Sequence, residues 1–293
     1  MKPLVAIVGR PNVGKSTLTN ALVGEKIAIV TNKPQTTRNR ICAVVNREGC
    51  QFVFLDTPGL HKARTRLGDY MVKVVKESVA DVDAVLLLVE PIPHIGGPEA
   101  ELIRRIKELN VPAVLVINKI DTVEKEELLS VMQVYGAAHD FAAIVPISAK
   151  RNEGVDELLG LLAQFLPEGP QLFPEDMVTD QPERQVCAEI IREKLLLCLD
   201  KEIPHGTAVE ITTFSERDDG IIDLDATIYC EKASHKGIII GKGGAMLKKI
   251  STLARTDIEA FMGTKVFLQT WVKVKENWRD NMNLIKNFGY RDE

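Results

Sequence analysis

The chain has 293 residues, of which 45% are hydrophobic and 27% charged, as is ordinary for a folded protein of one large or two smaller domains. Its five cysteines show neither zinc-binding spacing nor a disulfide framework, so we expect reduced thiols in a cytoplasmic protein. No apolar stretch approaches the roughly 20 residues that cross a bilayer. The net charge of −4 divides into 20 basic and 20 acidic residues in 1–170, 5 and 14 in 171–230, and 12 and 7 in 231–293. The basic end of the chain is therefore the part that should attract phosphate groups.

Residues 1–166 alternate apolar runs with segments of helical spacing, such as EAELIRRIKEL. Five runs have the continuous apolar character of strands that are buried on both faces. They are LVAIVG, QFVFLD, AVLLLV, PAVLVIN and AAIVPIS. This alternation predicts an α/β domain with a mostly parallel, doubly wound sheet.

The first of these runs leads into GRPNVGKS, which fits the phosphate-loop pattern GxxxxGK[ST] and opens a predicted helix. In that context the backbone N–H groups surround phosphate oxygens, the lysine reaches the β- and γ-phosphates, and the serine hydroxyl binds Mg²⁺. The nucleotide contacts expected from this loop are Asn12, Val13, Gly14, Lys15, Ser16 and Thr17.

Three further motifs, DTPG, NKID and SAK, follow later predicted strands in that order. We expect Asp56 to hold Mg²⁺ and the Gly59 N–H to meet the γ-phosphate. The Asp121 carboxylate can accept N1–H and N2–H₂ of guanine, which adenine does not offer, and the Ala149 N–H should lie near the guanine O6. The contacts expected from these motifs are Asp56, Thr57, Pro58, Gly59, Asn118, Lys119, Asp121, Ser148, Ala149 and Lys150.

The polar segment TNKPQTTRNR lies between the first two motifs. A threonine in such a loop closes on Mg²⁺ and the γ-phosphate in the GTP state. We expect Thr37 to do so, with the adjacent Thr36 as the alternative. The predicted Mg²⁺ ligands are Ser16, Thr37 and Asp56, and the residues predicted to act in hydrolysis are Lys15, Thr37 and Gly59.

The four motifs together resemble the G domain of translation-factor-class GTPases over residues 1–166. One departure is Leu60, which stands where Ras-like enzymes have a glutamine that orients water. Leucine cannot hold water by a hydrogen bond, so we expect slow unassisted hydrolysis, with His61 as a minor candidate for that role. Asn12 resembles the asparagine with which some such GTPases hold K⁺, so stimulation by K⁺ is a further expectation.

The chain changes character at residues 166–183, which contain four prolines and five acidic residues. This composition predicts an extended linker, and we place the GTPase domain at 1–168, the linker at 169–183 and a second domain at 184–293. Beyond it, predicted elements follow in the order α-β-β-α-α-β, with the two strands of a hairpin joined at DDG. That order predicts a small α+β domain.

The second domain contains IIGKGG, a glycine loop between two predicted helices. Its spacing fits neither a second phosphate loop nor a dinucleotide loop, but it fits the GxxG loop of a KH domain, whose bare backbone lets a sugar-phosphate chain approach. We expect Trp271 and Trp278 to be packing residues rather than platforms for bases. The predicted RNA contacts are Ile239, Ile240, Gly241, Lys242, Gly243, Gly244, Lys248 and Lys249.

With its asparagine-containing phosphate loop, its PQTTR segment, DTPGLH and IIGKGG, nearly the whole chain resembles the Era family of bacterial ribosome-assembly GTPases. The resemblance implies a P-loop GTPase domain followed by a type II KH domain. It also implies binding to 16S rRNA near its 3′ end during 30S assembly. A monomer that depends on Mg²⁺, with some peripheral association at the cytoplasmic face of the inner membrane, is part of the same expectation.

We expect GTP and Mg²⁺ to order residues 31–40 and 57–68 and so to change the affinity for RNA. Two other functions stay open from the sequence. One is a switch whose KH fold docks a protein or membrane partner without RNA, and the other is a constitutive RNA-binding protein with a vestigial G domain.

Overall fold

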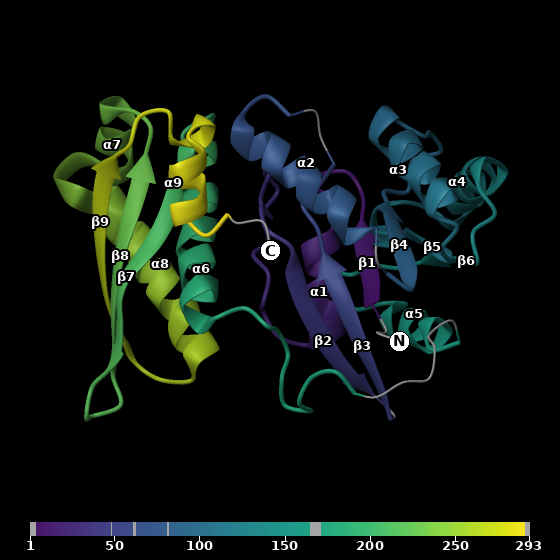
Figure 1. Ribbon diagram of the computed structural model, residues 1–293, viewed down its shortest axis with the longest axis horizontal. Coiled ribbons are helices and arrows are strands. Elements are labelled where there is room, and N and C mark those ends of the chain that lie inside the picture. Colours follow the sequence, from purple (N-terminus) through teal and green to yellow (C-terminus); the bar gives the residue numbers. More distant parts are fainter. Residues whose placement is uncertain (1–3, 48, 61–62, 81, 165–170, 291–293) are drawn as a thin grey trace. The chain divides into compact units, whose positions relative to one another are not determined.

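The computed structural model describes residues 4–47, 49–60, 63–80, 82–164 and 171–290 (Figure 1). The chain forms two compact units, and each of them is assembled from more than one stretch of sequence. The first unit comprises Met1–Ala28, Thr37–Ala63 and Gly68–Asp180, and the second comprises Ile29–Thr36, Arg64–Leu67 and Gln181–Glu293. Two short segments from the N-terminal part of the sequence therefore belong to the C-terminal unit. Within the described part of the chain, no helix has the length and apolar character needed to span a membrane.

The first unit is built around a six-stranded sheet of order β2-β3-β1-β4-β5-β6, in which β2 is antiparallel and the others are parallel. Strands β4 and β5 are fully buried, since α1 and α5 cover one face and α2, α3 and α4 the other. The expected α/β class is therefore confirmed. The elements are β1 Leu4–Val8, α1 Lys15–Val23, β2 Ile41–Arg47, β3 Cys50–Asp56, α2 Arg66–Ser78, β4 Ala84–Val89, α3 Gly97–Leu109, β5 Ala113–Ile117, α4 Lys125–Ala138, β6 Ala143–Pro146 and α5 Val155–Leu162.

Strand β2 is an addition to the five strands predicted from the sequence. It pairs with β3 over its whole length, from Ile41 opposite Asp56 to Arg47 opposite Cys50. Its five apolar residues, ICAVV, are buried. They follow directly on a polar loop, which hides the start of the strand in the sequence.

The segment after the last described helix of the first unit is held along β2. The Val44 N–H donates to the Val178 carbonyl at 2.9 Å, and the Thr179 hydroxyl donates to the Cys42 carbonyl at 2.7 Å. Residues 171–180 thus cover an edge strand that would otherwise expose its backbone groups. Most of the predicted linker, residues 169–183, belongs to the first unit, which extends to Asp180. The domain borders proposed from the sequence stay predictions.

The second unit has a three-stranded sheet of order β7-β8-β9, with β7 antiparallel and β9 parallel to β8. Helices α6, α7 and α8 share one hydrophobic core with the inner face of this sheet. The predicted α+β order is confirmed, and a short helix α9 follows it. The elements are α6 Glu183–Cys198, β7 Ala208–Glu216, β8 Ile222–Cys230, α7 Ala233–Ile240, α8 Ala245–Met262, β9 Val266–Val274 and α9 Met282–Asn287.

The two tryptophans of the second unit differ in their surroundings. Trp278 is fully buried, and its Nε1–H donates to the Gly206 carbonyl at 2.9 Å. Trp271 is 56% exposed, so the prediction that it is a packing residue is wrong. It stands on the outer face of β9, the face turned away from the helices, because side chains alternate along a strand.

Candidate nucleotide site and glycine loop

The phosphate loop joins β1 to α1 through residues that leave no room for larger side chains. A Cβ on Gly14 would lie 2.2 Å from the Asn118 Nδ2, and a Cβ on Gly59 would lie 2.6 Å from the Pro11 backbone nitrogen. The Asn118 amide donates to the Val13 carbonyl at 2.7 Å. Asn118, expected to contact the nucleotide, therefore also supports the phosphate loop from the neighbouring strand.

Oxygen atoms suitable for Mg²⁺ lie together at the start of α1. The Ser16 hydroxyl donates to the Asp56 Oδ2 at 2.7 Å and lies 2.8 Å from the Thr37 Oγ1. The Asp56 Oδ1 is buried and has no hydrogen-bond partner among the described residues. Two hydroxyls and one carboxylate match the hard, oxygen-only coordination of Mg²⁺, which usually takes few protein ligands beside phosphates and water. These three residues therefore fit the metal.

The two threonines that the sequence leaves open have different surroundings. The Thr36 hydroxyl donates to the Lys33 carbonyl at 2.7 Å and lies 2.6 Å from the Thr31 hydroxyl. Thr37, by contrast, is the residue beside Ser16. This placement favours Thr37 as the metal ligand.

The ionisable groups of the site are buried together. The Lys15 ammonium donates to the carbonyls of Gly9 at 3.2 Å and Arg10 at 3.0 Å. Burial lowers the pKa of Lys15 to about 8, although the Asp56 charge opposes this shift. Burial also raises the pKa of Asp56 to about 6, against the effect of Lys15. Each group loses hydration, which phosphate oxygens and a metal ion can replace.

The NKID and SAK motifs, predicted to select the base, lie at the ends of β5 and β6. The Ser148 hydroxyl donates to the Asp121 Oδ1 at 2.7 Å, and this hydrogen bond lowers the pKa of Asp121. The carboxylate is thus ionised and held in place. The Ala149 N–H, expected near the guanine O6, donates to the Asn118 Oδ1 at 3.0 Å in this structure. Lys119 is anchored by a 2.7 Å hydrogen bond to the Asn12 carbonyl.

Sequence reasoning missed an ionic network beside this site. Glu90, directly after β4, accepts hydrogen bonds from Lys119 at 2.5 Å and from Arg10. Burial alone would raise the pKa of Glu90, but the bonds and charges of these two cations lower it overall. The position of Glu90 in the sequence was the available signal, because Glu90 directly follows β4, which lies between two strands that are each followed by a motif. The network therefore restrains the side chain of Lys119, the lysine of NKID.

Leu60 is buried in the apolar cluster on one face of the sheet, and its N–H donates to the Gly9 carbonyl at 3.2 Å. Its side chain therefore does not orient water, as the sequence predicts. His61, the minor candidate for that role, lies outside the described residues. No group of three or more His, Cys, Asp or Glu side chains that could hold a metal occurs in the described ranges.

The glycine loop of the second unit joins α7 to α8. Gly241, Gly243 and Gly244 have φ angles of 74°, 60° and 82°, the left-handed region that favours glycine. A Cβ on Gly241 would lie 2.8 Å from the Met246 Cβ, whereas Gly243 has open space around it. The loop thus presents bare backbone, and the three lysines predicted as contacts are all exposed: Lys242, Lys248 and Lys249.

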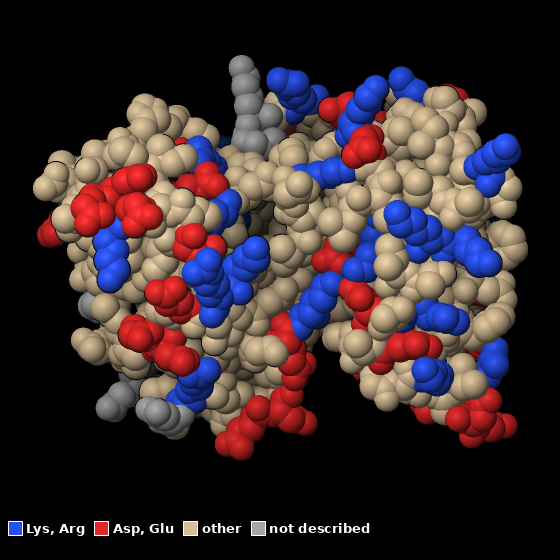
Figure 2. Space-filling model, turned by 180° about the vertical axis from the view of Figure 1, so that it is seen from behind, with Lys and Arg blue, Asp and Glu red and all other residues tan. Residues whose placement is uncertain are grey.

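The expected apolar contacts beside the loop need one correction. Ile239 is fully buried in the core of the second unit, since α7 turns that side chain toward the sheet, whereas Ile240 is partly exposed. The exposed isoleucine of this run is Ile238, at 50%. Exposed acidic side chains of the second unit include Glu216, the last residue of β7, and Asp218 and Asp219 of the β7–β8 turn. Figure 2 shows acidic and basic side chains interspersed over the face that it presents.

Two family models match the chain, one for each of the two site regions. That of the 50S ribosome-binding GTPase matches residues 4–119, and that of the KH domain matches residues 202–279. Both parts of the predicted fold are therefore confirmed: a P-loop GTPase domain followed by a KH domain.

Whole-chain relatives share this arrangement. The GTPase Era of Ruminiclostridium cellulolyticum is 53% identical over 287 residues, covering 98% of this chain and 96% of its own length. That of Alkaliphilus metalliredigens is also 53% identical, covering 98% and 97%. Two solved structures match over 100% of both chains with a TM-score of 0.95 at 39% identity: Era in complex with MgGDPNP and nucleotides 1506–1542 of 16S ribosomal RNA, and an Aquifex aeolicus Era variant bound to GDP·AlF₄⁻. The chain therefore belongs to the Era family of GTPases.

Proposed function

We propose that this GTPase binds 16S rRNA near its 3′ end through the KH loop and assists assembly of the 30S subunit. The observation that carries the proposal is the joint presence of a guanine nucleotide site and an exposed glycine loop flanked by lysines. A KH loop clamps the backbone of about four nucleotides. The similar Era structure that holds nucleotides 1506–1542 of 16S rRNA supports the choice of ligand.

At the nucleotide site, Ser16, Thr37 and Asp56 would hold Mg²⁺. The metal, when bound, neutralises charge that develops on the phosphates during transfer. Lys15 contributes positive charge from within the loop, and the Gly59 N–H is available for the γ-phosphate. Asp121 selects guanine, because its carboxylate would lose its partners with adenine.

The proposed function includes switching between nucleotide states. Only GTP carries the γ-phosphate that Thr37 and Gly59 are expected to contact, so residues 31–40 and 57–68 should differ between GTP and GDP. Affinity for RNA should differ accordingly. Because binding linkage is reciprocal, RNA should favour the GTP state by the same factor.

Three finer expectations from the sequence belong to this proposal. Potassium would stimulate hydrolysis through Asn12, whose left-handed backbone has a φ of 66°. The protein would be a monomer in the cytoplasm, and it would associate peripherally with the inner membrane. Hydrolysis rates measured in K⁺ and in Na⁺ test the first expectation, and equal rates would remove it.

The experiment that tests the proposal compares affinities for an RNA covering the 3′ end of 16S rRNA, in a GTP analogue and in GDP. Tighter binding with the analogue supports both the ligand and the coupling. Equally tight RNA binding in the two nucleotide states would support RNA as the ligand but contradict a switch between the states. Absence of binding in both states, or binding that is insensitive to salt, would favour a protein partner instead, since RNA contacts weaken steeply with salt.

A further inference from the structure

Helix α6 buries three consecutive charged residues. Arg192, Glu193 and Lys194 are 0%, 2% and 7% exposed. Successive residues on a helix are 100° apart, so the three point in directions that one flat interface cannot cover. The buried charge of Lys194 is balanced within its own unit, since its ammonium donates to Glu193 at 2.7 Å and to Asp257 of α8 at 2.5 Å. Arg192 pairs with Glu189 of the same helix, its Nε donating to Oε1 at 2.8 Å. Besides these contacts, Arg192 and Glu193 each reach a segment outside the helix.

Both residues hold the segment Ile29–Thr36, which belongs to the same compact unit as α6. The Glu193 Oε1 accepts the Val30 N–H at 2.9 Å, near the start of the segment. The Arg192 guanidinium donates to the Thr36 carbonyl at its end. Between them, the Lys33 ammonium donates to the Leu199 carbonyl, just past α6. The segment is therefore fastened at its start, middle and end.

The segment is also ordered internally. The Lys33 N–H donates to the Thr31 Oγ1 at 3.0 Å, and the Thr36 hydroxyl donates back to the Lys33 carbonyl at 2.7 Å. Gln35 takes a left-handed φ of 59° to complete the turn. A compact turn that is fastened at both ends fixes the direction in which the chain leaves it.

The residue that leaves this turn is Thr37. The Thr36 carbonyl, which Arg192 holds, and the Thr37 nitrogen belong to one planar peptide group. Holding that carbonyl therefore restricts the backbone that carries the Thr37 side chain, and this side chain lies 2.8 Å from the Ser16 hydroxyl. A guanidinium 155 positions later in the sequence thus restrains a residue of the phosphate site.

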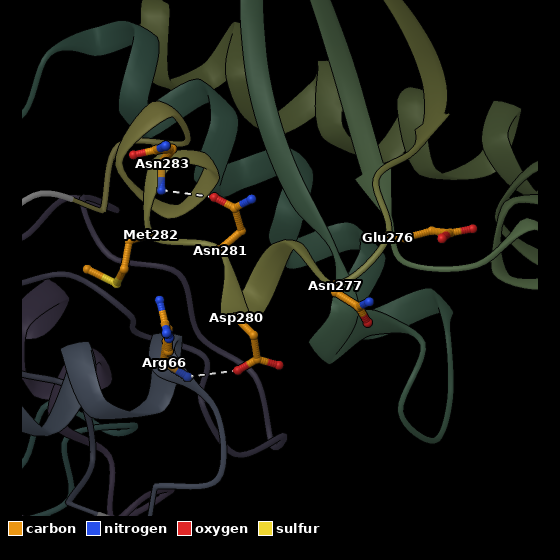
Figure 3. A pocket seen from close by; sticks show the side chains of 7 residues that line it. All are labelled: Arg66, Glu276, Asn277, Asp280, Asn281, Met282 and Asn283. Carbon is orange, nitrogen blue, oxygen red and sulfur yellow. Dashed lines mark hydrogen bonds between the residues drawn. The ribbon is translucent and has the colours of Figure 1, made fainter.

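The segment that follows DTPG is held in a comparable way. Arg64–Leu67 also belongs to the second unit, and the Arg66 N–H, at the start of α2, donates to the Asp280 Oδ1 at 3.0 Å (Figure 3). The first N–H groups of a helix have no acceptor within the helix, so the carboxylate supplies one. Both segments that neighbour the phosphate-binding motifs are therefore carried by the unit that contains the glycine loop.

We propose that Arg192, together with Glu193, is a positioning residue for Thr37, so that the KH-containing unit sets how readily the nucleotide site closes on the γ-phosphate. This inference rests on the proposed role of Thr37 as a ligand of Mg²⁺ and γ-phosphate. GDP has no γ-phosphate, so loss of the restraint affects GTP and leaves GDP nearly unchanged.

The test measures the dissociation constants of the full chain for Mg²⁺·GDPNP and Mg²⁺·GDP, without RNA. Arg192→Gln should weaken binding of the GTP analogue about tenfold, since a hydrogen bond to a charged group contributes at least that much, while GDP changes less than twofold. Arg192→Lys keeps a donor for the Thr36 carbonyl and should restore most of the affinity. Arg184→Gln, on an exposed position of the same helix, is the matched control and should change neither constant.

A loss that is equal for both nucleotides, or unchanged constants in Arg192→Gln, would overturn the proposal. Should Arg192→Gln not fold, Lys33→Ala removes the middle fastening at a partly exposed position, and the same selective weakening is expected. Equal constants in that variant and the wild type count against the proposal. Because RNA is absent, failure of this test is distinguishable from failure of RNA binding.

Discussion

At the scale of single residues, the proposed selection of guanine depends on the Asp121 carboxylate, which accepts a hydrogen bond from the Ser148 hydroxyl. Asp121→Asn should weaken GTP binding by about 100-fold or more, because an amide places a donor where the carboxylate accepts two guanine N–H groups. The same variant should gain affinity for xanthosine triphosphate, whose ring offers an acceptor in place of the amino group. Competition binding with both nucleotides measures this change in preference from GTP to xanthosine triphosphate.

The control for this change is Ser148→Ala, which removes the 2.7 Å hydrogen bond to Asp121 and keeps the carboxylate. It should weaken GTP without any gain for xanthosine triphosphate. If Asp121→Asn lost both nucleotides equally, the carboxylate would be structural rather than selective.

Asp56 gives the nucleotide-free protein a pH-dependent stability. Burial raises its pKa from 3.8 to about 6, so its contribution favours the folded state most at pH below 3.8 and is lost as the pH rises through 6. Asp56→Asn removes this dependence. Relative to the wild type, the variant should therefore gain on the order of 1 kcal/mol of unfolding free energy between pH 5 and pH 7.5. Urea unfolding in EDTA at both pH values measures the difference, and parallel pH profiles of the two proteins would contradict it.

Single residues also mark how far the sequence can predict the sites. Gly9, Gly14, Lys15 and Ser16 follow from the motif, because phosphate binding requires those residue types at that spacing. Their contacts with a nucleotide stay predictions. The sequence ranked Thr37 ahead of Thr36 without excluding Thr36, since the position of each hydroxyl depends on a turn that residues of α6 hold. Ile239 was misplaced for a related reason: in a run of three isoleucines, only the packing of α7 decides which one faces the core.

At the scale of elements, the α7–α8 loop contains glycines with unequal roles. Gly241→Ala should destabilise the second unit by about 1–3 kcal/mol, since the new Cβ would lie 2.8 Å from the Met246 Cβ and 2.9 Å from its nitrogen. The Cβ of Gly243→Ala would enter open space, so this variant should lose only about 1 kcal/mol of unfolding free energy, mainly because alanine disfavours the left-handed φ. Urea unfolding of the two variants measures the order, and equal losses would mean that the close approach to Met246 relaxes freely.

Strands at the edge of a sheet are harder to predict from the sequence than buried central strands. The buried central strands β4 and β5 are evident from their continuous apolar runs, whereas β2 was missed because it is an edge strand covered by distant residues. Residues 171–180 have a linker's composition, yet their backbone bonds to β2. Such pairing between segments more than 100 residues apart leaves no local signal in the sequence.

At the scale of the whole molecule, the charge of the glycine loop should decide binding of RNA. Lys242→Asp combined with Gly243→Asp places two carboxylates where a phosphate backbone is expected, and Gly243 has open space for the new side chain. Binding of the 16S rRNA 3′ region should be lost, because the charge changes from attraction to repulsion. Filter binding at low salt measures this, with the circular dichroism spectrum as the control for folding. Retained binding would place the RNA on another surface.

Binding of RNA and binding of the nucleotide should be coupled in this protein. If a GTP analogue raises the affinity for RNA by a given factor relative to GDP, RNA must raise the preference for the analogue over GDP by the same factor, because both measure one coupling free energy. Our proposal assigns this coupling to Ile29–Thr36 and Arg64–Leu67, which neighbour the phosphate motifs in sequence and belong to the KH-containing unit. Arg192→Gln should therefore lower both coupling factors equally, toward the value of 1 that means no coupling. Coupling factors in Arg192→Gln equal to those of the wild type would show that these segments do not carry the coupling.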